Sequence, residues 1–275
     1  MAGVLSGEVG IVTGAGRGFG RELALRLARE GAAVGLISRS RGDLDQVAGE
    51  IEAAGGRAFA ATADVVDRGQ VEAAVKAVES ALGPVSLLVN NAGLDRPFGP
   101  IGHVDPDEWW ATIAIHVRHP MLFMSAVLPG MRARGKGHIV NIASLGGRVV
   151  EPNMSAYAVG KAAEIRLTEH VAAEMRGAGI GVFAIEPGTV ITSMGASTLS
   201  NPEAQRWIPR GIEFLKAVQE AQKDPAVREQ VFRRCGDMVV SLLSGRYDVL
   251  SGRYLEPQDD FDALAADAAA AEQPS

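Results

Sequence analysis

The sequence predicts an α/β fold built on a single doubly wound parallel sheet of about seven strands, with helices on both faces. Up to Ile185, short β-rich runs alternate with longer Ala-rich segments of helical periodicity. Strands that are connected through helices form right-handed crossovers and a parallel sheet. The β-rich runs are apolar without a polar alternation, which is typical of strands covered on both faces. The length of 275 residues suits one large domain of this kind.

The periodicity places the elements in a regular order along the chain. Strands are expected at residues 9–12, 33–37, 57–61, 85–89, 138–142, 180–185 and 253–255. Helices between the first six strands are expected at roughly residues 18–30, 41–54, 67–81, 106–133 and 155–177.

The pattern changes after the sixth expected strand. Residues 193–235 are richer in charge and contain three prolines. We expect a helical insertion there, before the last strand, rather than a second domain. The whole domain is expected to span residues 1–260, and the Ala-rich, polar segment 261–275 is expected to be a flexible C-terminal tail.

Composition excludes several classes of protein. The chain has 27 Lys and Arg against 33 Asp and Glu, a net charge of −6, so it has no basic surplus to neutralise nucleic-acid phosphates. Cys235 is the single cysteine, which rules out an internal disulfide and a Cys-rich metal site, and we expect no metal. No apolar run approaches the ~18 residues that span a bilayer, and the N-terminus lacks the pattern of a signal peptide. We therefore expect a cytoplasmic protein with no membrane or nucleic-acid partner.

A glycine-rich turn follows the first expected strand. The segment IVTGAGRGFG, residues 11–20, leads from that strand into the first helix and has glycine at every second position from Gly14 to Gly20. Glycines let the backbone approach a pyrophosphate closely, and the helix N-terminus offers unpaired N–H groups to that anion. This placement predicts a dinucleotide site; the alternative is a tight turn without a ligand.

The end of the second strand predicts NADP(H) as the cofactor. The residue that contacts the adenosine ribose is expected about 20 residues after the glycine turn, where Ser38 and Arg39 stand. The first carboxylate, Asp43, is expected in the next helix. Arg39 and Arg17 can bind a 2′-phosphate through charge-assisted hydrogen bonds. The alternative is that both arginines are solvated surface residues.

Three polar residues predict acid–base chemistry at a substrate oxygen. Tyr157 and Lys161 are four residues apart in SAYAVGK, so a helix would place them on one face. The pKa of a free tyrosine is ~10, and a nearby ammonium lowers it. Ser144 ends the segment HIVNIAS, at the carboxyl edge of the sheet where ligands bind. Its hydroxyl can hold the alcohol or ketone oxygen with which Tyr157 exchanges a proton.

In combination, these motifs resemble the short-chain dehydrogenase/reductase family, whose fold is of the Rossmann type. The matching segments are TGxxxGxG (residues 13–20), NNAG (90–93), Ser144, YxxxK (157–161) and PGxxxT (187–192). They follow the family's order over about residues 5–195, and LSGRYL (250–255) resembles the family's last strand more loosely. The resemblance implies hydride transfer between nicotinamide C4 and the carbon of a small-molecule carbonyl or secondary alcohol.

The resemblance also implies a role for individual residues. Tyr157 would be the general acid or base, Lys161 would lower the Tyr157 pKa and bind the nicotinamide ribose, and Ser144 would orient the substrate oxygen. The residues that it places against the cofactor are Gly14, Arg17, Gly18, Phe19, Gly20, Ser38, Arg39, Asp64, Val65, Asn91, Ala92, Gly93, Tyr157, Lys161, Pro187, Gly188, Val190 and Thr192.

His116 departs from the family's pattern. It stands in IAIHVRHPMLF, where the family usually carries an asparagine that helps to hold a water chain leading from the lysine. Because an imidazole both donates and accepts hydrogen bonds, His116 can replace that asparagine in a proton relay and is a candidate catalytic residue. The alternative is a packed residue without a chemical role.

The substrate side is expected to be apolar. Leu94, Leu145, Met154 and Trp207 are the candidate pocket residues, and the segment 193–235 can form a lid that excludes water. The alternative is that the aromatic residues only anchor this segment to the core. Apolar residues surround the helices expected at 106–133 and 155–177, and the family resemblance implies a homodimer or homotetramer through them.

Two other functions remain open at this point. The chain can be a dinucleotide-binding sensor or scaffold without turnover, which only the change at His116 supports. It can also oxidise a sugar, steroid or aromatic alcohol with NAD at the same site. The leading hypothesis is an NADP(H)-dependent alcohol dehydrogenase or carbonyl reductase.

Overall fold

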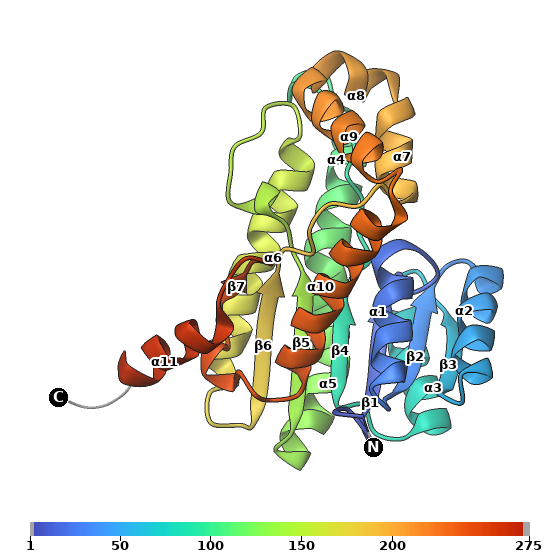
Figure 1. Ribbon diagram of the computed structural model, residues 1–275, viewed down its shortest axis with the longest axis vertical. Coiled ribbons are helices and arrows are strands. Elements are labelled where there is room, and N and C mark those ends of the chain that lie inside the picture. Colours follow the sequence, from blue (N-terminus) through green and yellow to red (C-terminus); the bar gives the residue numbers. More distant parts are fainter. Residues whose placement is uncertain (1–2, 272–275) are drawn as a thin grey trace.

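A seven-stranded parallel sheet forms the centre of the protein. The computed structural model describes residues 3–271, and its strands lie in the order β3–β2–β1–β4–β5–β6–β7 (Figure 1). They are β1 (Val9–Thr13), β2 (Ala33–Ser38), β3 (Arg57–Thr62), β4 (Leu87–Asn90), β5 (Gly137–Ile142), β6 (Ile180–Ile185) and β7 (Tyr254–Leu255). The strand order reverses between β1 and β4, and open α/β sheets bind ligands at such a switch point, outside the carboxyl ends of the strands. The predicted fold class is confirmed.

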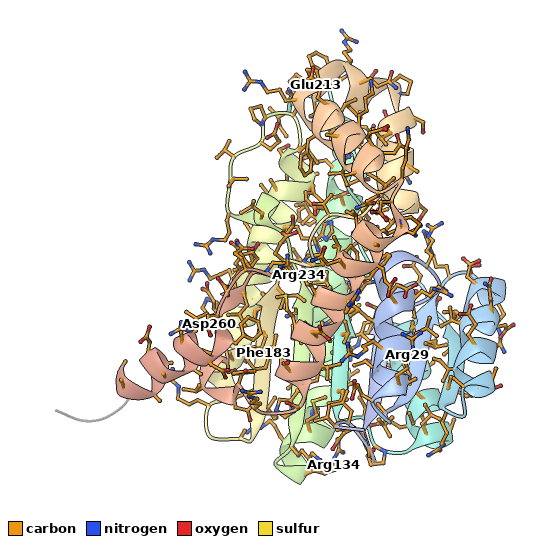
Figure 2. The ribbon with its side chains drawn as sticks, in the orientation of Figure 1. Arg29, Arg134, Phe183, Glu213, Arg234 and Asp260 are labelled. Atoms are coloured by element: carbon orange, nitrogen blue, oxygen red, sulfur yellow. The ribbon has the colours of Figure 1, made fainter. Side chains whose placement is uncertain are left out.

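Helices cover both faces of this sheet. The first face carries α1 (Gly18–Arg29), α2 (Arg41–Ala53) and α10 (Pro225–Leu243), and the second carries α3 (Arg68–Leu82), α5 (His119–Arg134) and α6 (Ser155–Glu174). Each face has its own apolar core, in which strand residues are buried from both sides, so the strands lack polar positions. Figure 2 shows Phe183 of β6 inside the fold, whereas Arg29 and Glu213 lie on its surface.

The helix expected at residues 106–133 is interrupted by a π-helical turn. It consists of α4 (Pro106–Ile113), the turn Ala114–Arg118 and α5. The Asp105 carboxylate caps α4 by accepting hydrogen bonds from the backbone N–H groups of Asp107 and Glu108, at 2.8 and 3.0 Å. The turn contains His116, and π-helical turns occur frequently at functional sites. Apolar periodicity did not predict the interruption, because apolar residues lie around much of this span and no distinct polar face marks the change of phase.

The span Pro106–Arg134 is long and apolar enough to cross a membrane by length and composition, although charged and polar residues interrupt its apolar runs. Its second half packs against the sheet, with Phe123, Val127 and Met131 buried in the core. The apolar composition of this span is therefore that of a core helix.

The segment before β7 forms two structures instead of one insertion. Three short helices, α7 (Ser193–Ser200), α8 (Pro202–Trp207) and α9 (Pro209–Ala221), gather beyond the carboxyl ends of the strands (Figure 1). The following α10 runs back along the sheet and buries Cys235, Val239 and Leu242. The predicted insertion 193–235 therefore ends too late, because α10 already begins at Pro225. The first turns of α10 are exposed and as rich in charged residues as the insertion before them, so composition did not separate the two.

The predicted flexible tail is wrong for residues 261–271, which form helix α11 (Phe261–Ala271). The Phe261 ring packs edge-on against Tyr247 at 5.4 Å, and the Tyr247 hydroxyl donates to Asp262 Oδ1 at 2.8 Å. Ala268 of this helix is buried in the core, and Leu264 and Ala265 pack against it, so tertiary contacts add to the high helix propensity of alanine. The rest of the predicted tail, residues 272–275, lies outside the described residues.

Candidate active site

The glycine-rich turn joins the carboxyl end of β1 to the N-terminus of α1. Gly14 and Gly18 have φ angles of +64° and +57°, which L side chains rarely adopt. A Cβ on Gly20 would lie 2.2 Å from the backbone oxygen of Gly14, so this position also requires glycine. The N-cap residue Arg17 makes no side-chain hydrogen bond to the first turn of α1, which leaves that helix end open to an anion.

Residues that follow β4 hold this turn in place. Asn91 Nδ2 donates to the backbone oxygen of Thr13 at 2.9 Å, and the backbone N–H groups of Asn91 and Ala92 donate to Thr13 Oγ1 at 2.9 and 3.2 Å. His119, which the sequence analysis did not assign to the site, lies behind the same hydroxyl, with Nε2 2.9 Å from Thr13 Oγ1. Burial lowers the pKa of His119 to about 3, so its ring is neutral at physiological pH. The NNAG segment thus connects two strands at the switch point.

The adenosine end of the turn carries charges of both signs. Ser38 ends β2, and Arg17 and Arg39 are exposed there. Asp43 lies in α2, as expected, but its side chain faces the turn: a Cβ on Gly16 would lie 2.7 Å from Asp43 Cβ and 3.5 Å from Ser38 Oγ. The Asp43 carboxylate therefore lies beside Gly16, the residue before Arg17, which sequence spacing did not show.

The segments after β3 and β6 lie at the same edge of the sheet as the glycine-rich turn. Asp64 follows β3, and its carboxylate accepts a hydrogen bond from the Val66 backbone N–H at 3.1 Å. Thr192 follows β6 and lies against the glycine turn, since a Cβ on Gly18 would be 3.2 Å from the Thr192 methyl group. Of the remaining predicted cofactor residues, Val65 and Val190 are buried and Phe19, Gly93, Pro187 and Gly188 are half-buried around the same edge.

Glu186 ties two of these segments together. One carboxylate oxygen accepts a hydrogen bond from the Leu145 backbone N–H, and the other accepts one from the Gly188 backbone N–H at 3.2 Å. Burial raises the pKa of Glu186, and the two backbone hydrogen bonds oppose this shift. Glu186 is thus a loop carboxylate that is bonded to the backbone on both sides.

Ser144 and Tyr157 meet at Gly146. Ser144 follows β5, and its Oγ accepts a hydrogen bond from the Gly146 backbone N–H at 3.1 Å. Tyr157 lies in the first turn of α6. A Cβ on Gly146 would lie 3.0 Å from Tyr157 Cε1 and 3.5 Å from Ser144 Oγ, so the absent side chain allows the phenol ring and the hydroxyl to share one corner. The structure thus brings the predicted serine and tyrosine together.

Lys161 is engaged differently from the expectation. Its Nζ donates to the backbone oxygen of Ile142 at 2.5 Å and lies 2.8 Å from Glu164 Oε2. Burial raises the pKa of Tyr157, an interaction with Ser144 opposes the rise, and the charges of Glu186, Asp95 and Glu164 add to it. The sequence analysis missed Glu164, although a carboxylate three residues after Lys161 lies on the same helix face.

His116 packs directly against Tyr157. Its Nε2 donates to the backbone oxygen of Leu94 at 2.6 Å, and its ring stands edge-on to the Tyr157 ring at 5.4 Å. Burial, together with the charge of Lys161, lowers the pKa of His116 well below its usual value, so the ring is neutral. Nδ1 is buried and has no hydrogen-bond partner among residues 3–271, which leaves one free acceptor beside the tyrosine.

The candidate substrate residues divide into two groups. Met154 packs on the small apolar cluster that includes Phe98 and Ile208, and the Trp207 backbone oxygen accepts a hydrogen bond from Asn153 Nδ2 at 2.8 Å. Both residues thus anchor the short helices α7–α9 to the rest of the fold. Leu145 is 46% exposed beside Ser144, which leaves its side chain available to a ligand.

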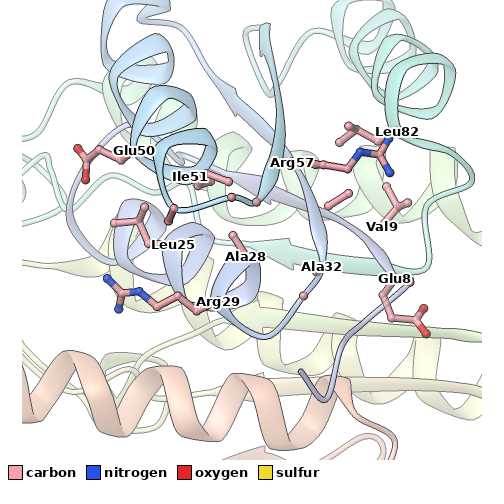
Figure 3. Close-up of a pocket in the computed structure, with 16 residues that line it drawn as sticks. Glu8, Val9, Leu25, Ala28, Arg29, Ala32, Glu50, Ile51, Arg57 and Leu82 are labelled. Carbon is pink, nitrogen blue, oxygen red and sulfur yellow. The ribbon is translucent and has the colours of Figure 1, made fainter. Parts of the chain in front are cut away.

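A separate hollow of about 540 Å³ lies at the opposite end of the sheet (Figure 3). Glu8 and Val9, at the start of β1, line it together with Arg29 of α1 and Arg57 of β3. Ligands of open α/β sheets bind at the carboxyl ends of the strands, so this hollow is not part of the candidate site. Within the described part of the chain, no group of three or more His, Cys, Asp or Glu side chains is arranged to hold a metal ion.

Comparisons with known proteins show the family to which the sequence and the fold are similar. The sequence profile of the family described as short chain dehydrogenase matches residues 8–203. A short chain dehydrogenase of Pseudocercospora fijiensis is 34% identical over 270 residues, which is 97% of this chain and 85% of that protein. The 2-(S)-hydroxypropyl-CoM dehydrogenase 3 of Xanthobacter autotrophicus is 38% identical over 209 residues, 74% of this chain and 82% of that protein. The crystal structure of a gluconate 5-dehydrogenase from Burkholderia cenocepacia in complex with NADP and tartrate has a TM-score of 0.77 and 29% identity, and covers 92% of this chain and 94% of that chain.

Proposed function

The chain belongs to the short-chain dehydrogenase family, and on this premise we propose that it reduces a small-molecule carbonyl, or oxidises the matching secondary alcohol, with a nicotinamide cofactor. The observation that carries the proposal is the meeting of Tyr157 and Ser144 at Gly146, at the carboxyl edge of the sheet that also carries the glycine turn. A bound nicotinamide supplies or accepts the hydride, and the protein supplies the proton and the orientation.

The side chains divide this work. The Ser144 hydroxyl holds the substrate oxygen, and the Tyr157 hydroxyl exchanges a proton with it. Two of the three Lys161 ammonium protons are bound by Ile142 and Glu164, and the third is free for a ribose hydroxyl. The residues that we propose for cofactor contacts are those named in the sequence analysis, from Gly14 to Thr192.

We propose NADP(H) as the cofactor. The exposed Arg17 and Arg39 beside Ser38 support this preference, because two guanidinium groups bind a 2′-phosphate. The similar gluconate 5-dehydrogenase was crystallised with NADP. Asp43 acts against the preference, since its carboxylate lies next to the same turn. Dissociation constants of NADPH and NADH decide the point, and NADH binding as tight as that of NADPH would contradict it.

We propose that His116 takes the place of the family's asparagine as a relay residue. Its buried, unpaired Nδ1 can accept a hydrogen bond from a water molecule next to Lys161. Replacement His116→Asn tests this role through the pH profile of turnover. An unchanged rate and profile would mean that the histidine only packs against Tyr157.

The enzyme activity is tested with NADPH and a panel of ketones, by following the loss of dihydronicotinamide absorbance. Tyr157→Phe is expected to bind NADPH as the wild type does and to lose turnover. A second candidate is a dinucleotide-binding protein without turnover, which the engagement of Lys161 by Glu164 favours. Tight NADPH binding without turnover of any carbonyl or alcohol would support that candidate instead.

We propose a homodimer or homotetramer through the helices α4, α5 and α6. Exposed apolar side chains on these helices support it: Trp110, Met121 and Val159 are 64, 38 and 49% exposed. Light scattering after size-exclusion chromatography measures the assembly, and a monomer at micromolar concentration would contradict it. A cytoplasmic location remains a prediction from the sequence.

A further inference from the structure

A buried ion pair lies in α6, one turn beyond Tyr157. Lys161 Nζ lies 2.8 Å from Glu164 Oε2, and the two side chains are only 6 and 3% exposed. The same ammonium donates to the backbone oxygen of Ile142 at the end of β5. The cation that is expected to act on Tyr157 is thus held by a carboxylate of its own helix.

Hydrogen bonds fix this part of α6 against the sheet. The Thr168 hydroxyl donates to the backbone oxygen of Glu164 at 2.9 Å and accepts from Asn141 Nδ2 at 2.8 Å. Asn141 Oδ1 accepts in turn from Asn90 Nδ2 at 2.8 Å. Thr168, Asn141 and Asn90 are themselves buried, so this chain of bonds through α6, β5 and β4 holds the backbone that carries the carboxylate.

Burial raises the pKa of Glu164 to about 7, and the Lys161 ammonium opposes this shift. Once Glu164 is ionised, the pair carries no net charge toward the phenol. A positive charge near a tyrosine favours the phenolate, and a negative charge disfavours it. Because the charges of Lys161 and Glu164 are only 2.8 Å apart, their effects on Tyr157 largely cancel. A neutral pair leaves burial to favour the protonated phenol.

The other titratable groups around Tyr157 add no positive charge. The His116 ring is neutral, and the Arg148 guanidinium lies over the Tyr254 ring, 5.2 Å from its centroid. The His116 ring in the π-helical turn contacts the Tyr157 ring. The carboxylates whose charges act on the phenol come from neighbouring segments: Asp95 after β4, Glu186 after β6 and Glu164 in α6. The three carboxylates in this set all disfavour the phenolate.

We propose that Glu164 is a positioning residue that balances the charge of Lys161 and keeps the Tyr157 hydroxyl protonated, so that the site serves carbonyl reduction. In this direction the carbonyl carbon receives the hydride from the reduced nicotinamide, and the carbonyl oxygen receives the Tyr157 proton. The products are the alcohol, the oxidised nicotinamide and a phenolate, which takes a proton from solvent. The inference rests on the proposed function, because it requires Tyr157 to be the proton donor.

The first test measures Tyr157 directly and needs no substrate. The chain has three tyrosines, so tyrosinate absorbance can be followed against pH and assigned by subtracting the Tyr157→Phe variant. Glu164→Gln is expected to move the ionisation of Tyr157 to lower pH by about one unit or more, about tenfold in its ionisation constant. The matched control is Glu169→Gln, which removes an exposed pair with Arg166 at the same spacing in the same helix. A Tyr157 ionisation that Glu164→Gln leaves unmoved would overturn the inference.

The second test uses the reaction. The pH profile of kcat/KM for alcohol oxidation is expected to move to lower pH in Glu164→Gln, and Glu164→Asp is expected to restore the wild-type profile. If Glu164→Gln lowers the rate equally at every pH, its role is structural and the inference is wrong. If the wild type turns over no carbonyl or alcohol, the proposed function fails, and the tyrosinate titration alone decides the effect of Glu164.

A double variant guards against misfolding of the single ones. Lys161→Met combined with Glu164→Gln removes both charges and keeps similar volumes, so the protein is not left with a buried unpaired ion. The Tyr157 ionisation of this variant is expected to stay close to that of the wild type, because the pair is neutral in both. A shift to lower pH as large as in Glu164→Gln alone would contradict charge balance as the cause.

Discussion

Removal of Glu164 tests how much the buried ion pair contributes to the folded state. In Glu164→Leu the Lys161 ammonium, which is 6% exposed, loses its carboxylate and keeps only the backbone oxygen of Ile142. Breaking a buried pair by removing one partner costs about 3–5 kcal/mol, because an uncompensated charge remains. We therefore expect the free energy of unfolding to fall by about that amount.

The same helix provides the control. Arg166 and Glu169 form a pair with the same three-residue spacing, but their side chains are 72 and 40% exposed. Water screens such a pair, so Glu169→Leu is expected to cost at most about 1 kcal/mol. Urea unfolding followed by circular dichroism at one pH and salt concentration compares the two variants.

The double variant Lys161→Met/Glu164→Leu completes the measurement. Apolar replacement of both partners is often close to neutral, so this protein is expected to be more stable than Glu164→Leu alone. Equal losses in Glu164→Leu and Glu169→Leu would refute the reasoning, because burial would then make no difference to the cost of breaking the pair.

Three further predictions concern other parts of the site. Gly20→Ala is expected to weaken NADPH binding about tenfold or more, measured by fluorescence titration, because the new Cβ would lie 2.2 Å from the Gly14 oxygen; unchanged affinity would contradict the glycine-turn geometry. Arg39→Ala is expected to weaken NADPH about tenfold or more and NADH little, while Asp43→Asn is expected to strengthen NADPH; equal effects of Arg39→Ala on both cofactors would exclude a 2′-phosphate contact. Burial lowers the pKa of His119 to about 3 in the folded state, against about 6.5 in the unfolded chain. The neutral His119 therefore contributes fully to the stability of the fold above pH 6.5, and the free energy of unfolding falls by up to about 5 kcal/mol as the pH falls toward 3. His119→Gln is expected to remove this part of the acid dependence in urea unfolding, and an identical pH dependence of both proteins would show that His119 does not carry it.

The regular part of the fold could be predicted because its causes are local. Apolar runs such as Ile180–Ile185 become strands wherever helices cover both faces, and the observed strands differ from the expected ones by at most a few residues. The C-terminal part could not be predicted in the same way. Helix α11 depends on the contact of Phe261 with Tyr247, and the role of α10 depends on Val239 and Leu242 facing the sheet. Composition does not report either contact.

The same distinction holds at the site. Ser144 and Tyr157 could be predicted as neighbours because strand order places the residues after β5 beside the first turn of α6. The state of Lys161 could not, because it depends on whether Glu164 three residues away is buried or solvated. Helical spacing is the same for Glu164 and for the exposed Glu169 relative to their partners. The packing of α6 against the sheet decides that Glu164 pairs with a buried cation and Glu169 with an exposed one.

The most direct test of the proposed chemistry is ketone-dependent oxidation of NADPH by the wild type and by Tyr157→Phe, with NADPH affinity measured for both. We expect equal affinity and a loss of turnover of about 10²–10⁴-fold in the variant, because only the proton donor has been removed. Turnover by Tyr157→Phe at the wild-type rate would contradict the central role of this hydroxyl.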